Sequence, residues 1–137
     1  AINRALGWDS ATDAALIGVG SLGSALLGYS GFEEQNLSVV VAFDADKRLQ
    51  MTSIHGVKVH PMEDLKRLVR QLKIKLAILA VPSAAAQDCA DELVDAKIKG
   101  ILNFTAVQLS VPKGVIVQNV DLAQPLAVLS HAIARNA

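Results

Sequence analysis

The sequence of 137 residues is poor in aromatic residues and in cysteine. Phe, Trp and Tyr together make up 4% of the chain, whereas hydrophobic residues make up 52%. A core must therefore be built mainly from Val, Ile, Leu and Ala, which suits buried parallel strands and packed helices better than an all-β sandwich. Charged residues reach only 19%, and a chain this apolar is not intrinsically disordered. The length fits one domain.

The chain also lacks an excess of charge of either sign. Thirteen basic residues balance thirteen acidic ones, whereas a DNA- or RNA-binding domain normally has a basic excess, because phosphate neutralisation supplies most of its affinity. The single cysteine, Cys89, excludes an internal disulfide and agrees with a reducing, cytoplasmic location. We expect no metal site, because His55, His60 and His131 have no second ligand at metal-binding spacing.

Only one uncharged run is long enough to span a bilayer. It covers the nineteen residues 14–32, of which five are glycine and three are serine. A strand, a tight turn and a helix explain this composition better than a transmembrane helix does. We therefore expect no membrane partner.

Strand-like and helix-like segments alternate along the chain. Strands are expected at 14–18, 37–44, 57–60, 74–81, 98–104 and 114–120, and helices at 21–30, 61–72, 83–96 and 125–135. Gly31 should end the first helix in a left-handed conformation, and Ser83 should cap the third helix. The alternation predicts an α/β fold with a mainly parallel sheet and helices on both of its faces.

A glycine-rich loop follows the first expected strand. Its six residues, Gly18, Val19, Gly20, Ser21, Leu22 and Gly23, match the pattern G-x-G-x-x-G between a strand and a helix. Gly18 would allow the tight turn, Gly20 would let a pyrophosphate approach the backbone, and Gly23 would let the helix pack closely on the sheet. The N–H groups at the start of the helix would then hold the negative charge.

An acidic residue stands where the second expected strand ends. Asp44 lies about twenty residues beyond the glycine loop, the spacing at which a carboxylate accepts hydrogen bonds from the adenosine ribose of a dinucleotide. A carboxylate at this place repels a 2′-phosphate, so it favours NAD(H) over NADP(H). Together, the loop and Asp44 predict a nucleotide-binding site.

Two stretches of sequence resemble the Rex family of redox-sensing transcriptional repressors, specifically its NAD(H)-binding domain. They are GVGSLGSALLGYSGF, followed by VVVAFDAD, and AILAVPSAAAQDCADELVDAKIKGILNFTAVQLSVPKGVIVQNVDLA. The NF pair at Asn103 and Phe104 and the series SVP-G-V-V-NVDL are more specific than the glycine pattern. The resemblance extends from about Leu6 to Ser130.

The resemblance implies a Rossmann-like, doubly wound fold that senses the ratio of NADH to NAD+. NADH binding would shift a homodimer to a state that releases operator DNA. The operator would be bound by an N-terminal winged-helix domain that this chain lacks. Either that domain was cut off or the chain is a natural form without it, and Ala1 in place of Met favours the first alternative. Residues 1–124 would form the NAD(H)-binding domain, and residues 125–137 a C-terminal helix that dimerises the protein.

The nicotinamide end of the site is expected where further strands end. Val81, Pro82, Asn103 and Phe104 are the candidates, from their position and from the resemblance. For Phe104, packing in the core is an equally good interpretation. We expect no catalytic residue, since Ser83 lies in no G-x-S-x-G motif and has no paired histidine. Cys89 is expected to be a buried small hydrophobic residue.

Two other functions are compatible with the same pattern. The chain would be the cofactor-binding domain of an NAD-dependent oxidoreductase if a proton-relay residue faced the nicotinamide. It would be a CoA-binding domain if the site accepted the 3′-phosphate of CoA, against which the charge of Asp44 counts.

Overall fold

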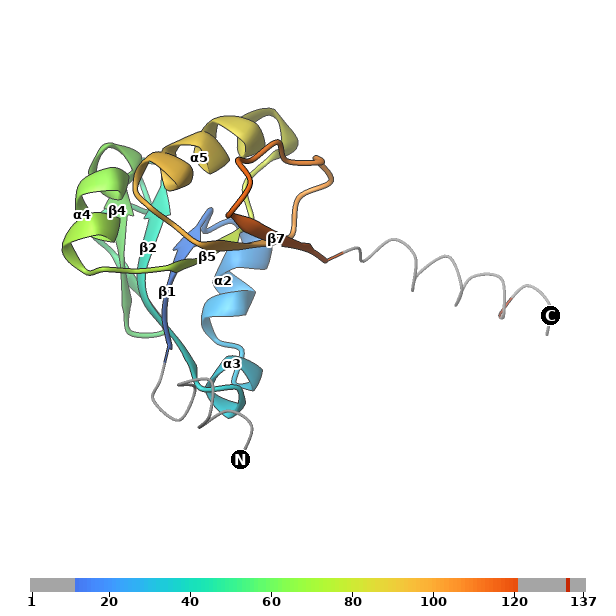
Figure 1. The fold of residues 1–137 in the computed structure, drawn as a ribbon. Coiled ribbons are helices and arrows are strands. Elements are labelled where there is room, and N and C mark those ends of the chain that lie inside the picture. The colour runs from blue at the N-terminus through green and yellow to red at the C-terminus, as the bar shows by residue number, and fades with distance from the viewer. Residues whose placement is uncertain (1–11, 121–132, 134–137) are drawn as a thin grey trace.

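A seven-stranded sheet with helices on both faces organises the chain in the computed structural model, which describes residues 12–120 and 133 (Figure 1). The strands are β1 (Thr12–Ile17), β2 (Leu37–Asp44), β3 (Ser53–Ile54), β4 (Val57–Pro61), β5 (Leu76–Leu79), β6 (Gly100–Asn103) and β7 (Ile116–Asn119). The helices are α2 (Ser21–Leu27), α3 (Gly31–Glu34), α4 (Leu65–Gln71) and α5 (Ser83–Asp95), with a 3₁₀ turn η1 at Met62–Asp64. The expected Rossmann-like α/β fold is confirmed.

The strand order is β3-β4-β2-β1-β5-β6-β7, and every pair except β3–β4 is parallel. The chain runs outward from β1 through β2 to β4, then crosses back to β5 on the other side of β1. This reversal leaves a crevice at the carboxyl ends of β1 and β5, where open α/β sheets bind their ligands.

The two faces of the sheet have separate cores, because successive residues of a strand point to opposite faces. Ala15, Ile17 and Leu79 face the side covered by α4 and α5. Leu16 and Ile78 face the other side, where Leu26, Leu27 and Phe32 of α2 and α3 pack against them. The buried core consists almost entirely of aliphatic side chains, as the composition predicts.

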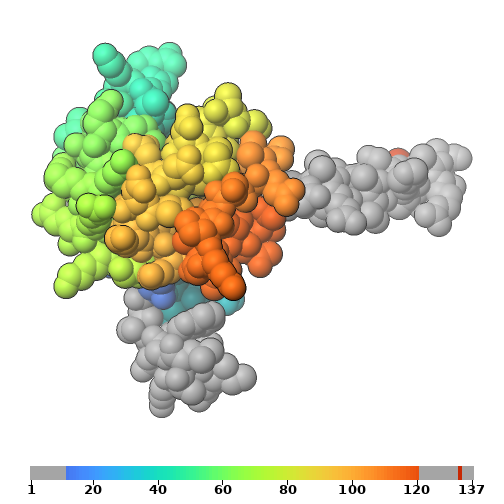
Figure 2. Space-filling model, turned by 45° about the horizontal axis from the view of Figure 1, so that its top comes forward, coloured from blue at the N-terminus to red at the C-terminus, as the bar shows by residue number. Residues whose placement is uncertain are grey.

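The connection between β6 and β7 lies against α5 instead of forming a helix. Figure 2 shows residues 105–115, in orange, beside α5, in yellow. Gln87 and Ser110 join the two segments with a reciprocal pair of hydrogen bonds. The Gln87 amide donates to the Ser110 carbonyl at 2.9 Å, and the Ser110 N–H donates to the Gln87 side-chain oxygen at 2.8 Å.

The expected helix over residues 21–30 is wrong in its last three residues. Helix α2 ends at Leu27, and Gly28 follows with φ −93°, so the end of the helix is not left-handed. A Cβ on Gly28 would lie 2.7 Å from Nε2 of His55, which leaves no room for a side chain at the point where the chain turns. Gly31 then begins the short helix α3 instead of ending α2.

The start expected at residue 61 for the second helix is also wrong, and so is the cap expected at Ser83, although α5 begins at Ser83 as expected. Pro61 ends β4, and the 3₁₀ turn η1 separates it from α4. Helix α5 begins at Ser83 with Pro82 at the cap position, and no side chain caps its first turn. The sequence pattern also missed the β3–β4 hairpin, whose two-residue loop has positive φ at both His55 and Gly56.

The uncharged run from residue 14 to residue 32 forms β1, the glycine loop, α2 and the start of α3. No helix in residues 12–120 is long and apolar enough to cross a membrane, and α5, the longest of them, has thirteen residues. The expected helix over 125–135 lies outside the described residues, apart from position 133.

We predict that Gly23→Ala destabilises the fold although alanine is the better helix former. A Cβ at this position would overlap the carbonyl of Gly18, a backbone group that has little freedom to move. The expected loss is about 2 kcal/mol, or a fall of about 5 °C in melting temperature, measured by calorimetry. The matched control is Gly20→Ala, because a Cβ there meets no atom within 4 Å. Equal melting temperatures of the two variants would contradict this account.

Candidate functional site

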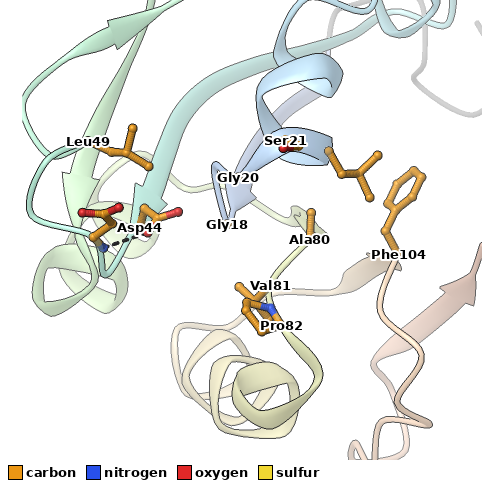
Figure 3. Close-up of a pocket in the computed structure, with 11 residues that line it drawn as sticks. Gly18, Gly20, Ser21, Asp44, Leu49, Ala80, Val81, Pro82 and Phe104 are labelled. Carbon is orange, nitrogen blue, oxygen red and sulfur yellow. Dashed lines mark hydrogen bonds between the residues drawn. The ribbon is translucent and has the colours of Figure 1, made fainter.

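A pocket of about 440 Å³ opens at the carboxyl ends of β1, β2, β5 and β6 (Figure 3). It therefore occupies the crevice that the reversal of strand order creates. The residues that line it are Gly18, Gly20, Ser21, Leu22, Asp44, Asp46, Leu49, Ala80, Val81, Pro82 and Phe104.

The glycine loop forms the middle of the pocket, where two elements approach each other closely. Gly18 has φ +98°, and a Cβ on it would lie 2.5 Å from the Ala80 carbonyl oxygen at the end of β5. Gly20, in contrast, faces open space. Helix α2 begins directly afterwards, and no side chain caps its first turn. The backbone is thus crowded at Gly18 and accessible two residues later, at Gly20.

Asp44 holds the glycine loop as well as lining the pocket. Its Oδ2 accepts a hydrogen bond of 2.7 Å from the N–H of Val19, and its Oδ1 accepts one of 2.8 Å from the N–H of Asp46. Because a carboxylate offers about four acceptor positions, each oxygen keeps capacity for a further donor. Asp44 therefore joins the end of β2 to the loop after β1 and still presents an acceptor to the pocket.

A second acid on the same side of the pocket is paired with a cation. Nε and Nη2 of Arg48 donate to Oδ1 and Oδ2 of Asp46 at 3.2 Å and 2.9 Å. These hydrogen bonds lower the pKa of Asp46 below its ordinary value. Asp46 is therefore ionised at neutral pH, and the guanidinium of Arg48 is already engaged.

The opposite end of the pocket is apolar. Val81, Pro82 and Phe104 line it together with Leu22. The Phe104 N–H donates to the Leu79 carbonyl at 2.9 Å, which ties the end of β6 to β5. Phe104 also packs against the core beneath α2, so it both lines the pocket and takes part in core packing. Figure 3 shows Asp44 and Phe104 on opposite sides of the glycine loop.

The structure brings most of the expected site residues together, and three of them stand back from the pocket. Val19 is buried and reaches Asp44 only through its N–H, and Gly23 packs against Gly18. Asn103 is fully buried, and the donors and acceptors of its side chain are hydrogen-bonded to other protein groups.

Three lining residues were missed by the sequence analysis. They are Asp46, Leu49 and Ala80. Ala80 follows the end of a buried strand, which is the signal that pointed to Val81 and Pro82. Leu49 and Asp46 lie in the loop after β2, and no pattern in that loop marks them.

A smaller apolar cavity of about 210 Å³ adjoins the pocket and shares Gly18, Asp44, Val81 and Pro82 with it. Cys89 lines this cavity, and burial, followed by the charges of Glu92 and Asp88, raises the pKa of its thiol to about 11. The thiol is therefore protonated at neutral pH, as expected for a buried hydrophobic residue. Within residues 12–120, no group of three or more His, Cys, Asp or Glu side chains is placed to hold a metal ion.

Comparisons with known proteins agree on one family. Residues 9–107 match the family model described as the CoA binding domain. The chain is 49% identical over 128 residues to the redox-sensing transcriptional repressor Rex of Lactobacillus acidophilus, which covers 93% of this chain and 61% of that protein. The chain thus spans about three fifths of the length of the curated relatives it matches.

Solved structures of one Rex-family repressor, RSP, have the same fold. RSP in complex with beta-NADH superimposes with a TM-score of 0.90 at 35% identity, covering 98% of this chain and 65% of that one. RSP in complex with beta-NAD+ and operator DNA gives 0.88 at 35% identity, covering 98% and 62%. The chain therefore carries a CoA binding domain, and it belongs to the Rex family.

Proposed function

We propose that this chain is the NADH/NAD+ sensing domain of a Rex-type transcriptional repressor. The observation that carries the proposal is the order of groups along the pocket: an acid, an open glycine loop and an apolar end. The curated relatives are named as repressors and not as enzymes, and RSP has been crystallised with both beta-NADH and beta-NAD+. Both findings support a regulatory role in the cytoplasm.

Each part of a dinucleotide has a counterpart in the pocket. The free space at Gly20 admits a pyrophosphate, which a side chain at that position would exclude. The remaining acceptor capacity of Asp44 suits the ribose hydroxyls of adenosine. The negative charge of Asp44 disfavours a 2′-phosphate, so we assign NAD(H) and not NADP(H); the charge of Asp46 is already paired with Arg48 and adds nothing to this preference.

The apolar end of the pocket would distinguish the two redox forms. The nicotinamide ring is neutral in NADH and cationic in NAD+, and burying an unpaired cation is costly. Val81, Pro82 and Phe104 offer this ring an apolar wall without a charged partner. Since a ligand shifts an equilibrium only through differential affinity, this end of the site would generate the signal.

We assign the response to a homodimer joined by the C-terminal helix of residues 125–137. Leu126, Val128, Leu129, Ala132 and Ile133 make this segment apolar nearly all round, so it needs burial on more than one side. Operator DNA would be bound by a winged-helix domain outside this chain, and NADH would favour the dimer that releases it.

A CoA-binding role is the competing function, because the matching family model carries that description. The charge of Asp44 argues against it, since CoA has a phosphate on the ribose that we assign to the neighbourhood of Asp44. Calorimetric titrations with NADH, NAD+ and CoA separate the two functions. Saturation by CoA, with no heat from either form of NAD, would overturn the proposal.

Asp44→Ala should weaken NADH binding by about 1–3 kcal/mol, the scale of charge-assisted hydrogen bonds to the ribose. The same change should narrow the gap between NADH and NADPH, because the charge that repels the 2′-phosphate is lost. The ratio of the two affinities, measured on one sample, does not depend on the folded fraction. An unchanged ratio would remove Asp44 from the ribose site.

Phe104→Ala should reduce the preference for NADH over NAD+ more than it reduces NAD+ binding itself. We expect the unchanged chain to prefer NADH at least about tenfold, which corresponds to about 1.4 kcal/mol. ADP-ribose, which lacks the nicotinamide, is the control ligand, and its affinity should not change. Equal affinities of the unchanged chain for NADH and NAD+ would contradict redox sensing.

Deletion of residues 125–137 should give a poorly soluble domain that no longer dimerises, because it exposes the apolar surface that the helix covers. Analytical ultracentrifugation of the full chain and the truncated chain measures the change. A well-behaved dimer after the deletion would place the interface elsewhere.

A further inference from the structure

Asn103 stands next to a pocket residue and yet has no free group to offer a ligand. It is the one fully buried polar side chain among the described residues. A carboxamide has two N–H donors and an oxygen with two acceptor positions. In Asn103 all four are used by protein groups, so this side chain does not bind cofactor directly.

Three of these four bonds shape the turn that follows Phe104. Nδ2 of Asn103 donates to the Val107 carbonyl at 2.9 Å, while Oδ1 accepts from the N–H and the hydroxyl of Thr105 at 3.0 Å and 2.7 Å. The Thr105 hydroxyl oxygen in turn accepts from the Val107 N–H at 3.2 Å. Residues 103–107 are thus closed into one hydrogen-bonded turn with Phe104 inside it.

The fourth bond reaches the neighbouring strand. Nδ2 of Asn103 donates to Oδ1 of Asn119, its register partner on β7, at 2.9 Å. One residue later, the Val120 N–H donates to the Asn103 carbonyl at 2.9 Å. The end of β7, from which the chain passes into residues 121–137, is therefore joined to the turn that carries Phe104.

This arrangement is more than the fold needs. The parallel ladder between β6 and β7 is made by backbone groups and does not need the bond between Asn103 and Asn119, and the other three bonds of Asn103 satisfy groups of the turn itself. Asn119 is also exposed, so its amide is not needed to fill the core. The polar pair instead fixes one orientation of the turn around Phe104.

We propose that Asn103 and Asn119 are positioning residues, whose side-chain hydrogen bond holds Phe104 at the apolar end of the pocket and links it to the end of β7. If the domain senses NADH and NAD+ as proposed, the pair would increase the ratio of the two affinities in favour of NADH.

The test uses Asn119→Ala, with Gln118→Ala as the matched control. Both replace an exposed amide on β7, and the Gln118 side chain makes only a 3.4 Å contact with the Asn119 carbonyl. In the cofactor-free chain, the ring signals of Phe104 in ¹³C NMR should shift or broaden in Asn119→Ala and stay in place in Gln118→Ala. Unchanged Phe104 signals in Asn119→Ala would overturn the proposal, whatever the cofactor binding shows.

Binding measurements then test the consequence for discrimination. Asn119→Ala should lower the NADH/NAD+ affinity ratio about threefold, the scale of one hydrogen bond, and leave ADP-ribose affinity unchanged. Combined with Phe104→Ala, it should have no further effect on the ratio, because it acts through that ring. Full additivity of the two substitutions would overturn the proposal.

The two proposals fail in different ways. Equal affinities of the unchanged chain for NADH and NAD+ would refute redox sensing, and the Phe104 signals would still decide whether the pair positions the ring. A normal preference in the unchanged chain that Asn119→Ala retains in full would refute the positioning role and leave redox sensing intact.

Discussion

Close contact between backbone groups at the end of β1 is the constraint on which the rest of this domain depends. Gly18 lies against the Ala80 carbonyl, and Gly23 lies against Gly18 itself, so two side chains are missing where β1, β5 and α2 meet. The contact sets the angle at which α2 leaves the sheet and leaves Gly20 facing open space. The open space that we assign to a pyrophosphate thus lies directly beside tightly packed backbone atoms.

In the proposed site, the carboxylate of Asp44 both stabilises the local fold and binds the ligand. Its carboxylate fixes Val19 and Asp46 by their N–H groups, so an acceptor for a ligand is oriented before any ligand arrives. An acceptor held in this way loses little conformational freedom on binding. It also means that substitutions of Asp44 act on the loop as well as on the ligand, which is why ratios of affinities are more informative than single values.

Features that depend on neighbours in sequence were predictable, and features that depend on distant partners were not. The alternation of strands and helices and the glycine loop follow from apolar runs and from glycine spacing, and the structure has both, whereas the order of the strands in the sheet was not predicted. Gly31 was misjudged because α2 already ends at Leu27, and the His55 side chain that lies close to Gly28 comes from a hairpin far along the chain, which no local pattern reveals. Asn103 was placed correctly at a strand end, but its partner Asn119 is sixteen residues away and nothing in the local pattern reveals the bond.

The protonation state of the thiol of Cys89 bears on how the proposed sensor would return from its NADH-bound form to its free form. Oxidants attack a thiolate and not a thiol, and Cys89 is buried with a pKa of about 11. Peroxide therefore finds little thiolate to react with at Cys89, and no covalent record of oxidation accumulates on this thiol. The domain proposed here would report the nicotinamide pool through reversible occupancy alone, with its recovery time set by ligand dissociation and without a repair enzyme.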